Sequence, residues 1–203
     1  MTSILSFVLA TSILALSPGP DNIYVLVQSI SNGKSSGLAT VLGLISGCIV
    51  HTTLLAFGIS AVVKTNENLF FVLKVFGALY LLFLAYKTFN SKEQMFYNSK
   101  VNKDGLIKLF KRGFMMNVLN PKVMVFFLAF FPGFLFSETL NIVVQFYILG
   151  GIFMLTSSFI FFGIVLLSTH IKPFLVKYTK IQMVFKWLQI FVFIGIAVYI
   201  LKS

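Results

Sequence analysis

Residues 16–22 read Leu-Ser-Pro-Gly-Pro-Asp-Asn, and residues 117–122 read Asn-Val-Leu-Asn-Pro-Lys. Each stretch interrupts an apolar run that is long enough to cross a bilayer as a helix. A proline inside a helix removes one backbone hydrogen bond, and in lipid the freed carbonyl needs another partner within the protein. Paired interruptions at matching places in two halves of a chain point to the binding site of a secondary transporter. The sequence therefore predicts a small secondary transporter.

The composition is typical of an integral membrane protein. Of the 203 residues, 58% are hydrophobic and 10% are charged, and the mean hydropathy is +0.97. Soluble domains carry about 25% charged residues. The net charge of +11 comes mostly from Lys and Arg in short segments between apolar runs, which indicates membrane topology and argues against nucleic-acid binding. We therefore expect an all-α integral membrane fold.

Windows of about 20 apolar residues predict six transmembrane helices. We place them at roughly 3–29, 38–63, 69–89, 113–136, 140–168 and 183–201. A long polar connection divides them into two groups of three, and an odd number makes the groups cross the membrane in opposite directions. We therefore expect two inverted three-helix repeats, with the first and fourth spans broken at proline.

These spans predict one transmembrane transporter domain over residues 1–203. Repeat 1 covers about 1–89, a cytoplasmic loop about 90–112, and repeat 2 about 113–203.

The basic residues predict the orientation. Three Lys would lie on one face, and twelve Lys and Arg would lie on the other: Lys34, Lys87, Lys92, Lys100, Lys103, Lys108, Lys111, Arg112, Lys172, Lys177, Lys180 and Lys186. Because positive residues stay on the cytoplasmic side, both termini are predicted outside the cytoplasm.

Asp21 is the acid predicted to lie at membrane depth, directly after the Pro18-Gly19-Pro20 break. A charge there is costly, so it should face a cavity or a partner. One interpretation is a helix cap at the start of the next segment. The other is a carboxylate that binds a substrate ammonium or carries a coupling proton, and the two are compatible.

Lys122 is the counterpart of Asp21 in the second half, because it follows Asn120-Pro121 directly. It could snorkel to the interface. Alternatively, it faces inward and meets Asp21 or a substrate carboxylate, which would complete a site for a zwitterion.

The broken segments offer further polar groups. A half-helix N-terminus suits an anionic group, and unwound carbonyls suit a cation. Asn22, Asn117 and Asn120 could therefore bind substrate together with the backbone, or they could only satisfy the broken backbone.

The second predicted span carries Gly43, Gly47 and His51 at four-residue spacing, on one helix face. Small residues at this spacing favour close helix packing. His51 is interpreted either as a buried, hydrogen-bonded histidine or as a proton relay. The fifth span has a similar small or polar set, also interpreted as packing: Gly150, Gly151, Thr156, Ser157 and Ser158.

Several chemistries lack their motifs. The chain has two His and one Cys, with no metal-ligand spacing, no phosphate-binding loop and no nucleophile beside a base. We therefore predict a protein that is not an enzyme, with no cofactor or metal site.

These motifs resemble the lysine exporter and homoserine/threonine efflux family, the LysE/RhtB translocators. The resemblance rests on residues 17–22, on Gly33 to Gly47 with His51, and on Gly113 to Pro132 around Asn120-Pro121-Lys122. It implies a proton-driven amino-acid exporter of the bacterial inner membrane, which works as an antiporter and forms a homodimer. The family's motif positions correspond here to Pro18, Gly19, Pro20, Asp21, Asn120, Pro121 and Lys122. Alternatives are efflux of another solute, such as a metal ion, and a channel-like membrane protein.

Overall fold

The structure is a computed structural model that describes residues 2–17, 19–59, 67–90, 104–177 and 179–202. These residues form helices joined by short connections, and no strand occurs among them. The predicted all-α class is therefore confirmed for the described part of the chain.

The first half begins with a broken helix. Helix α1 (Thr2–Leu16) ends at the first proline motif, and α2 (Pro20–Asn32) begins at its second proline. Proline suits the first turn of a helix because its missing N–H would be unpaired there. Gly33, with φ of 89°, then turns the chain into α3 (Lys34–Leu54). A π-helical turn η1 (Leu55–Ile59) extends α3, and α5 (Glu67–Asn90) completes this half.

The second half repeats this order. Helix α6 (Leu106–Val118) ends at the second proline motif, and α7 (Pro121–Val125) begins at its proline. A π-helical turn η2 (Phe126–Phe130) and a 3₁₀ turn η3 (Phe131–Phe134) extend α7. Two long helices follow, α8 (Ile142–Lys177) and α9 (Thr179–Lys202).

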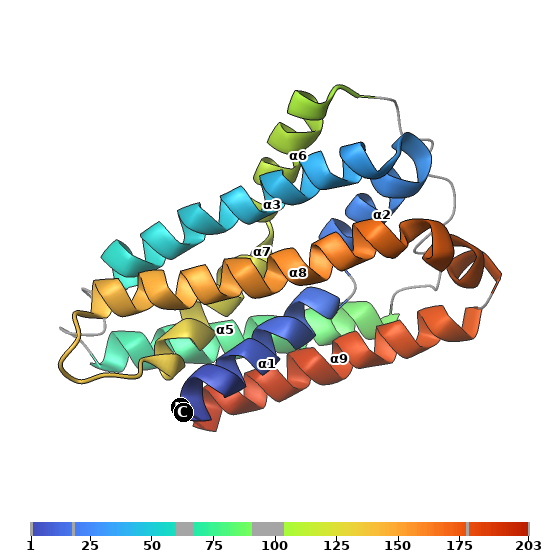
Figure 1. Cartoon of the computed structure of the whole chain (residues 1–203). Helices are drawn as coiled ribbons and strands as arrows, with labels where there is room; N and C mark the ends of the chain where they lie inside the picture. The colour runs from blue at the N-terminus through green and yellow to red at the C-terminus, as the bar shows by residue number, and fades with distance from the viewer. Residues whose placement is uncertain (1, 18, 60–66, 91–103, 178, 203) are drawn as a thin grey trace.

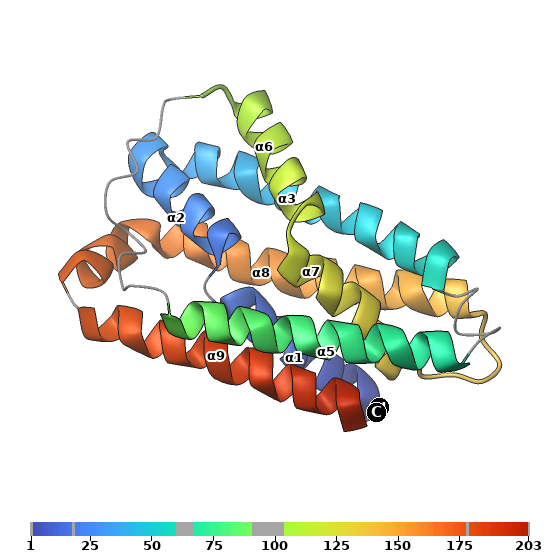
Figure 2. The same cartoon turned by 180° about the vertical axis from the view of Figure 1, so that it is seen from behind.

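The halves are interleaved. Helix α8 lies along the middle of the molecule, in contact with α1, α2 and α3, and α5 lies along α9 (Figures 1 and 2). Helix α6 crosses α3 at an angle. At this crossing a Cβ on Gly43 would overlap the backbone of Phe110, and one on Gly113 would overlap the carbonyl of Thr40. Glycine at both positions lets the two backbones touch, which places the end of α6 against α3.

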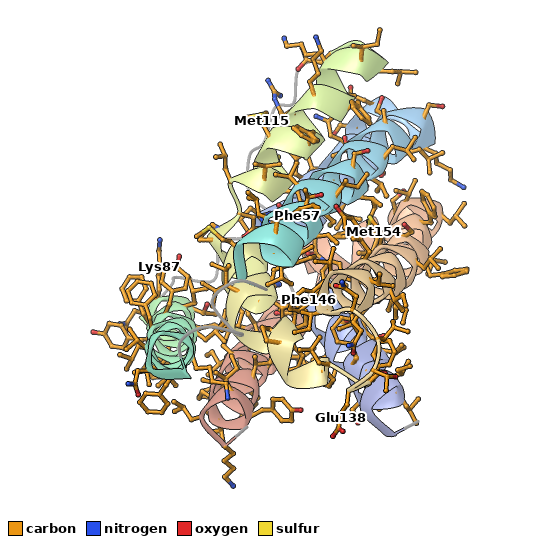
Figure 3. The ribbon with its side chains drawn as sticks, turned by 90° about the vertical axis from the view of Figure 1, so that its left-hand side faces the viewer. Phe57, Lys87, Met115, Glu138, Phe146 and Met154 are labelled. Carbon is orange, nitrogen blue, oxygen red and sulfur yellow. The ribbon has the colours of Figure 1, made fainter. Side chains whose placement is uncertain are left out.

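An aromatic cluster fills the interior beside α7. Phe127 stacks on Phe131 with 4.1 Å between ring centroids, and Phe7 from α1 meets Phe131 edge to face at 5.0 Å. Phe146 points into this interior, whereas Lys87 on α5 and Met115 on α6 point outward (Figure 3). This core holds α1, α7 with its extension, and α8 together.

The described residues contain two helices that are long and apolar enough to cross a membrane, Lys34–Gly58 and Ile142–Ser168. Two further spans arise if each bent pair counts as one, Ile4–Leu16 with Pro20–Asn32 and Leu106–Val118 with Pro121–Phe134. The bends lie where the sequence predicts the first and fourth spans to break. The third and sixth predicted spans coincide with α5 and α9, and the count of six stays a prediction.

Helix α6 begins earlier than the predicted fourth span. Residues 106–112 lie in the expected loop, but they are helical because apolar residues recur at helical spacing among the basic ones. Residues 91–103 of that loop lie outside the described residues.

Candidate functional site

The two helix breaks meet at one cavity of about 30 Å³. This volume holds one or two water molecules. The cavity lies between α1, α2, α3, α6, α7 and α8. It is lined by Leu14, Ala15, Gly19, Asp21, Asn22, Ile45, Cys48, Asn117, Asn120, Lys122, Val123, Phe153, Ser157 and Phe161. Six of the ten predicted site residues belong to this lining: Gly19, Asp21, Asn22, Asn117, Asn120 and Lys122.

At the first break, one distant side chain and one nearby side chain satisfy the carbonyls. Pro18 has no N–H, so the Leu14 carbonyl four residues earlier cannot be bonded within the helix. Instead Lys122 Nζ donates to the Leu14 oxygen and to the Ser17 oxygen, each at 3.0 Å. Asn22 Nδ2 donates to the Ala15 oxygen at 2.6 Å. The predicted role of Asn22 in satisfying the broken backbone is therefore seen in the structure.

At the second break, the freed carbonyl is that of Asn117, four residues before Pro121. It accepts from Asn120 N at 2.9 Å and lies 3.0 Å from His51 Nε2. Asn120 also caps α7, because its Oδ1 accepts from the Lys122 backbone N–H at 3.0 Å. A side-chain acceptor at this position satisfies an N–H that the helix leaves unpaired.

A hydrogen bond between the two halves joins the breaks. Asn120 Nδ2 donates to Asp21 Oδ2 at 2.7 Å, and both side chains are buried. Asp21 is the second residue of α2, where the helix dipole favours a negative charge. The residue that occupies the cap position is Gly19, and it makes no side-chain capping bond.

The buried Asp21 and the half-buried Lys122 line the same cavity without a salt bridge between them. No contact of 4.0 Å or less joins Asp21 to Lys122, although the structure describes both side chains. The Lys122 ammonium instead meets carbonyl oxygens and lies 5.8 Å from the centre of the Phe193 ring. Its inward orientation differs from the snorkelling interpretation.

The other predicted residues lie nearby. Pro20 and Pro121 begin the second segments of their broken helices. Gly19 lines the cavity, and a Cβ added to it would lie 3.8 Å from Lys122 Nζ. His51 is buried and contacts the site through the Asn117 carbonyl, without lining the cavity. Pro18 lies outside the described residues.

Sequence reasoning missed cavity residues that come from α3 and α8. Cys48 donates to Asn117 Oδ1 at 3.6 Å, and Ser157 lies between Phe153 and Phe161 at four-residue spacing. The four-residue spacing of Phe153, Ser157 and Phe161 can be seen in the sequence. It does not identify a binding site, because small and apolar residues at this interval also occur wherever helices pack.

A protein-family model described as LysE type translocator matches residues 12–203. The chain belongs to this family. Two homoserine/homoserine lactone efflux proteins, from Salmonella typhimurium and Salmonella typhi, are each 27% identical over 170 residues, covering 84% of this chain and 82% of theirs. The uncharacterized membrane protein YrhP of Bacillus subtilis is 27% identical over 207 residues, covering 98% of each chain. No solved structure matches the chain.

Family membership confirms the predicted LysE/RhtB resemblance and makes the chain a membrane translocator for a small molecule. Translocators move their substrate without chemical conversion, which agrees with the predicted non-enzyme.

Proposed function

We propose that this chain exports amino acids or related small zwitterionic metabolites across the bacterial plasma (inner) membrane in exchange for protons. The observation that carries the proposal is one cavity, between two broken helices, that is lined by a buried acid, Asp21, and a half-buried base, Lys122. Asp21 would bind the substrate ammonium, and Lys122 the carboxylate. The names of the Salmonella relatives, homoserine/homoserine lactone efflux proteins, favour this substrate class.

The polar groups beside the two charges fit the same role. Asn120 would position the Asp21 carboxylate, and Asn22 and Asn117 would offer further hydrogen bonds from either side of the cavity. Gly19, between Pro18 and Pro20, leaves space beside the Lys122 ammonium. Pro121 begins α7, whose N-terminal end lies at the cavity.

Substrate binding would require a change of partners and a wider cavity. Lys122 would exchange the Leu14 and Ser17 carbonyls for the substrate carboxylate, and the first helix break would loosen as it did so. An amino acid needs more room than one or two water molecules, so the substrate-bound conformation would hold α2 and α7 further from α8. Alternating access would follow from this movement.

Coupling would use a proton that competes with the substrate ammonium for Asp21. A membrane potential of 100 mV supplies about 2.3 kcal/mol per charge, enough to drive export against a gradient. His51 would relay the proton by way of water, because the Asn117 carbonyl that it contacts accepts a hydrogen bond but cannot pass a proton on.

The interleaved packing favours an inverted repeat with six spans. The first helix of each half contacts the second helix of the other, α1 with α8 and α6 with α3, and the third helices α5 and α9 contact each other. If each helix is replaced by its counterpart in the other half, the same set of contacts results, which is the pattern expected of an inverted repeat. Both termini would lie outside the cytoplasm. The protein would form the homodimer that the resemblance implies, with both copies in the bilayer.

Metal efflux remains the second candidate for test. It would need clustered ligands, and the described residues contain no group of three His, Cys, Asp or Glu that could hold an ion. The cavity offers one carboxylate and one ammonium, which suits a zwitterion better than a cation.

The test is efflux of a mixture of labelled amino acids from preloaded cells that carry the protein. Wild type is compared with Asp21→Asn, with Asp104→Asn as an acid outside the cavity, and with an uncoupler added. We expect export of one or a few amino acids that stops with Asp21→Asn and with the uncoupler, but not with Asp104→Asn. Export that survives Asp21→Asn would remove the carboxylate from the mechanism, and no amino-acid export at all would reject the substrate class.

A further inference from the structure

Ser157 carries a buried hydroxyl that has no partner. Its side chain is 2% exposed, and Oγ makes no hydrogen bond in the described part of the protein. The same residue lines the cavity between the helix breaks. A buried polar group without a partner costs free energy, so its presence at a cavity calls for an explanation.

Many helical hydroxyls among the described residues are satisfied locally, whereas Thr11 and Ser17, like Ser157, are buried without a partner; of these three, Ser157 is the one that lines the cavity. Serine and threonine in a membrane helix usually donate to a carbonyl one turn earlier. Five residues on α1, α2 and α3 do so over four residues, at 2.7–3.0 Å: Ser12, Ser29, Thr40, Ser46 and Thr52. Ser157 has the same opportunity on α8 and does not use it, which leaves its hydroxyl available to a molecule in the cavity.

The position of Ser157 complements the charged groups. Asp21 and Lys122 enter the cavity from α2 and α7, whereas Ser157 enters from α8 between two phenylalanines, Phe153 and Phe161. The α8 wall is therefore apolar with a single hydroxyl in its middle. If the charges hold the ammonium and carboxylate, the side chain of the same molecule is left to meet this wall.

We propose that Ser157 hydrogen-bonds the side chain of the transported molecule and selects amino acids whose short side chain carries a hydroxyl or another hydrogen-bonding group. This inference rests on the proposed function. A hydroxyl both donates and accepts, so it pairs with either kind of polar group. The neighbouring phenylalanines disfavour a charged side chain at this wall, because they offer it no partner.

The experiment compares homoserine with norvaline, which has a methyl group in place of the hydroxyl. Both are measured as labelled substrates in proteoliposomes that contain wild type, Ser157→Ala, Ser157→Thr or Ser158→Ala. Ser158 is the matched control, because it is the next residue on α8 and does not line the cavity. Thermal unfolding of each purified protein is recorded with and without each amino acid.

We expect wild type to prefer homoserine over norvaline. Ser157→Ala should reduce that preference about 3- to 10-fold, because the mutant lacks one hydrogen bond to the substrate. Ser157→Thr should keep the preference, and Ser158→Ala should match wild type. Ser157→Ala should unfold at the same temperature as wild type or higher, since it removes an unsatisfied group.

Three results would overturn the inference, and they are distinguishable. Wild-type transport with an unchanged preference in Ser157→Ala would reject the role of Ser157 and leave the proposed function standing. A large loss of thermal stability in Ser157→Ala with an unchanged preference would assign the hydroxyl a structural role. If wild type neither transports nor is stabilised by any labelled amino acid, the proposed function fails and the inference fails with it.

Discussion

The two helix breaks meet the same chemical need with different partners. At the second break, Asn120 caps α7 from within its own segment, and the Asn117 carbonyl accepts from the Asn120 N–H as well as facing His51. At the first break, no side chain caps α2, and Lys122 from the other half of the chain supplies both bonds to Leu14 and Ser17.

This difference makes one break dependent on the other. The second break keeps most of its hydrogen bonds by itself, whereas the first is held by a charged group that also lines the cavity. Any molecule that draws the Lys122 ammonium away would leave the Leu14 and Ser17 carbonyls without this partner, while Ala15 would keep its bond from Asn22. The cavity and the first break are therefore coupled through a single side chain.

The largest effect is expected from Lys122→Met, which keeps a long side chain and removes the ammonium. Two buried carbonyls would each lose a charged donor, at a cost of about 1.5–3 kcal/mol each. The thermal midpoint of the purified protein should fall by about 6–24 °C, and export should stop.

Lys87→Met is the control for Lys122→Met, because Lys87 is exposed on α5. It should change neither the midpoint nor export. If Lys122→Met unfolds at the wild-type temperature, the carbonyls of the first break have another partner and the comparison between the breaks is wrong.

A second pair of variants separates the two bonds of Asn120. Asn120→Ala loses the cap and the bond to Asp21, at about 2–5 kcal/mol together. Asn120→Asp keeps an acceptor for the Lys122 N–H but replaces the donor to Asp21 with a second carboxylate. We expect Asn120→Asp to be at least as unstable as Asn120→Ala in thermal unfolding at neutral pH. Wild-type stability of Asn120→Asp would show that the cap alone matters.

The places where the helices break were predictable, but the partners at each break were not. Proline lacks an N–H wherever it stands, so Pro121 alone identifies the freed Asn117 carbonyl. The bond from Lys122 to Leu14 spans 108 residues, and nothing in the local sequence indicates it. One of the interpretations of Lys122 paired it with Asp21, whereas Asp21 accepts from Asn120, 99 residues away.

The sequence prediction misses the partner of His51 and the start of α6. His51 fits the interpretation of a buried, hydrogen-bonded histidine, although its partner at Asn117 depends on how closely α3 and α6 cross. The lysines and the arginine within residues 106–112 predict a loop, yet the apolar residues among them form one face of α6. Tertiary contact between α3 and α6 decides the first outcome, and the helical spacing of the apolar residues in 106–112 decides the second.

A smaller effect is expected from His51, because its carbonyl partner has a second donor. His51→Leu removes one hydrogen bond to the Asn117 oxygen and should cost about 1–2 kcal/mol. His51→Gln keeps an N–H donor and should recover most of that loss in thermal unfolding. If both variants unfold like wild type but lose the pH dependence of export, His51 acts as a proton relay and not as a support for the break.

The smallest effect is expected at the start of α6, far from both breaks. Asp104 accepts from Lys108 at 2.7 Å and lies 3.2 Å from Arg112, which donates to Tyr24 on α2. The Lys108 hydrogen bond holds the pKa of the Asp104 carboxyl below its usual range. These contacts therefore stabilise α6 above the carboxyl's ordinary pKa and are lost as the pH falls through the lowered value.

Hydrogen exchange tests this contribution by comparing wild type with Asp104→Asn at each pH. Amides in the first turn of α6 should exchange faster in Asp104→Asn at neutral pH, and the ratio should approach one in acid. Amides near Asn117 should not differ, because the second break holds its own hydrogen bonds. A difference that reaches Asn117 would mean that this break also depends on distant partners, and the contrast between the two breaks would then be one of degree.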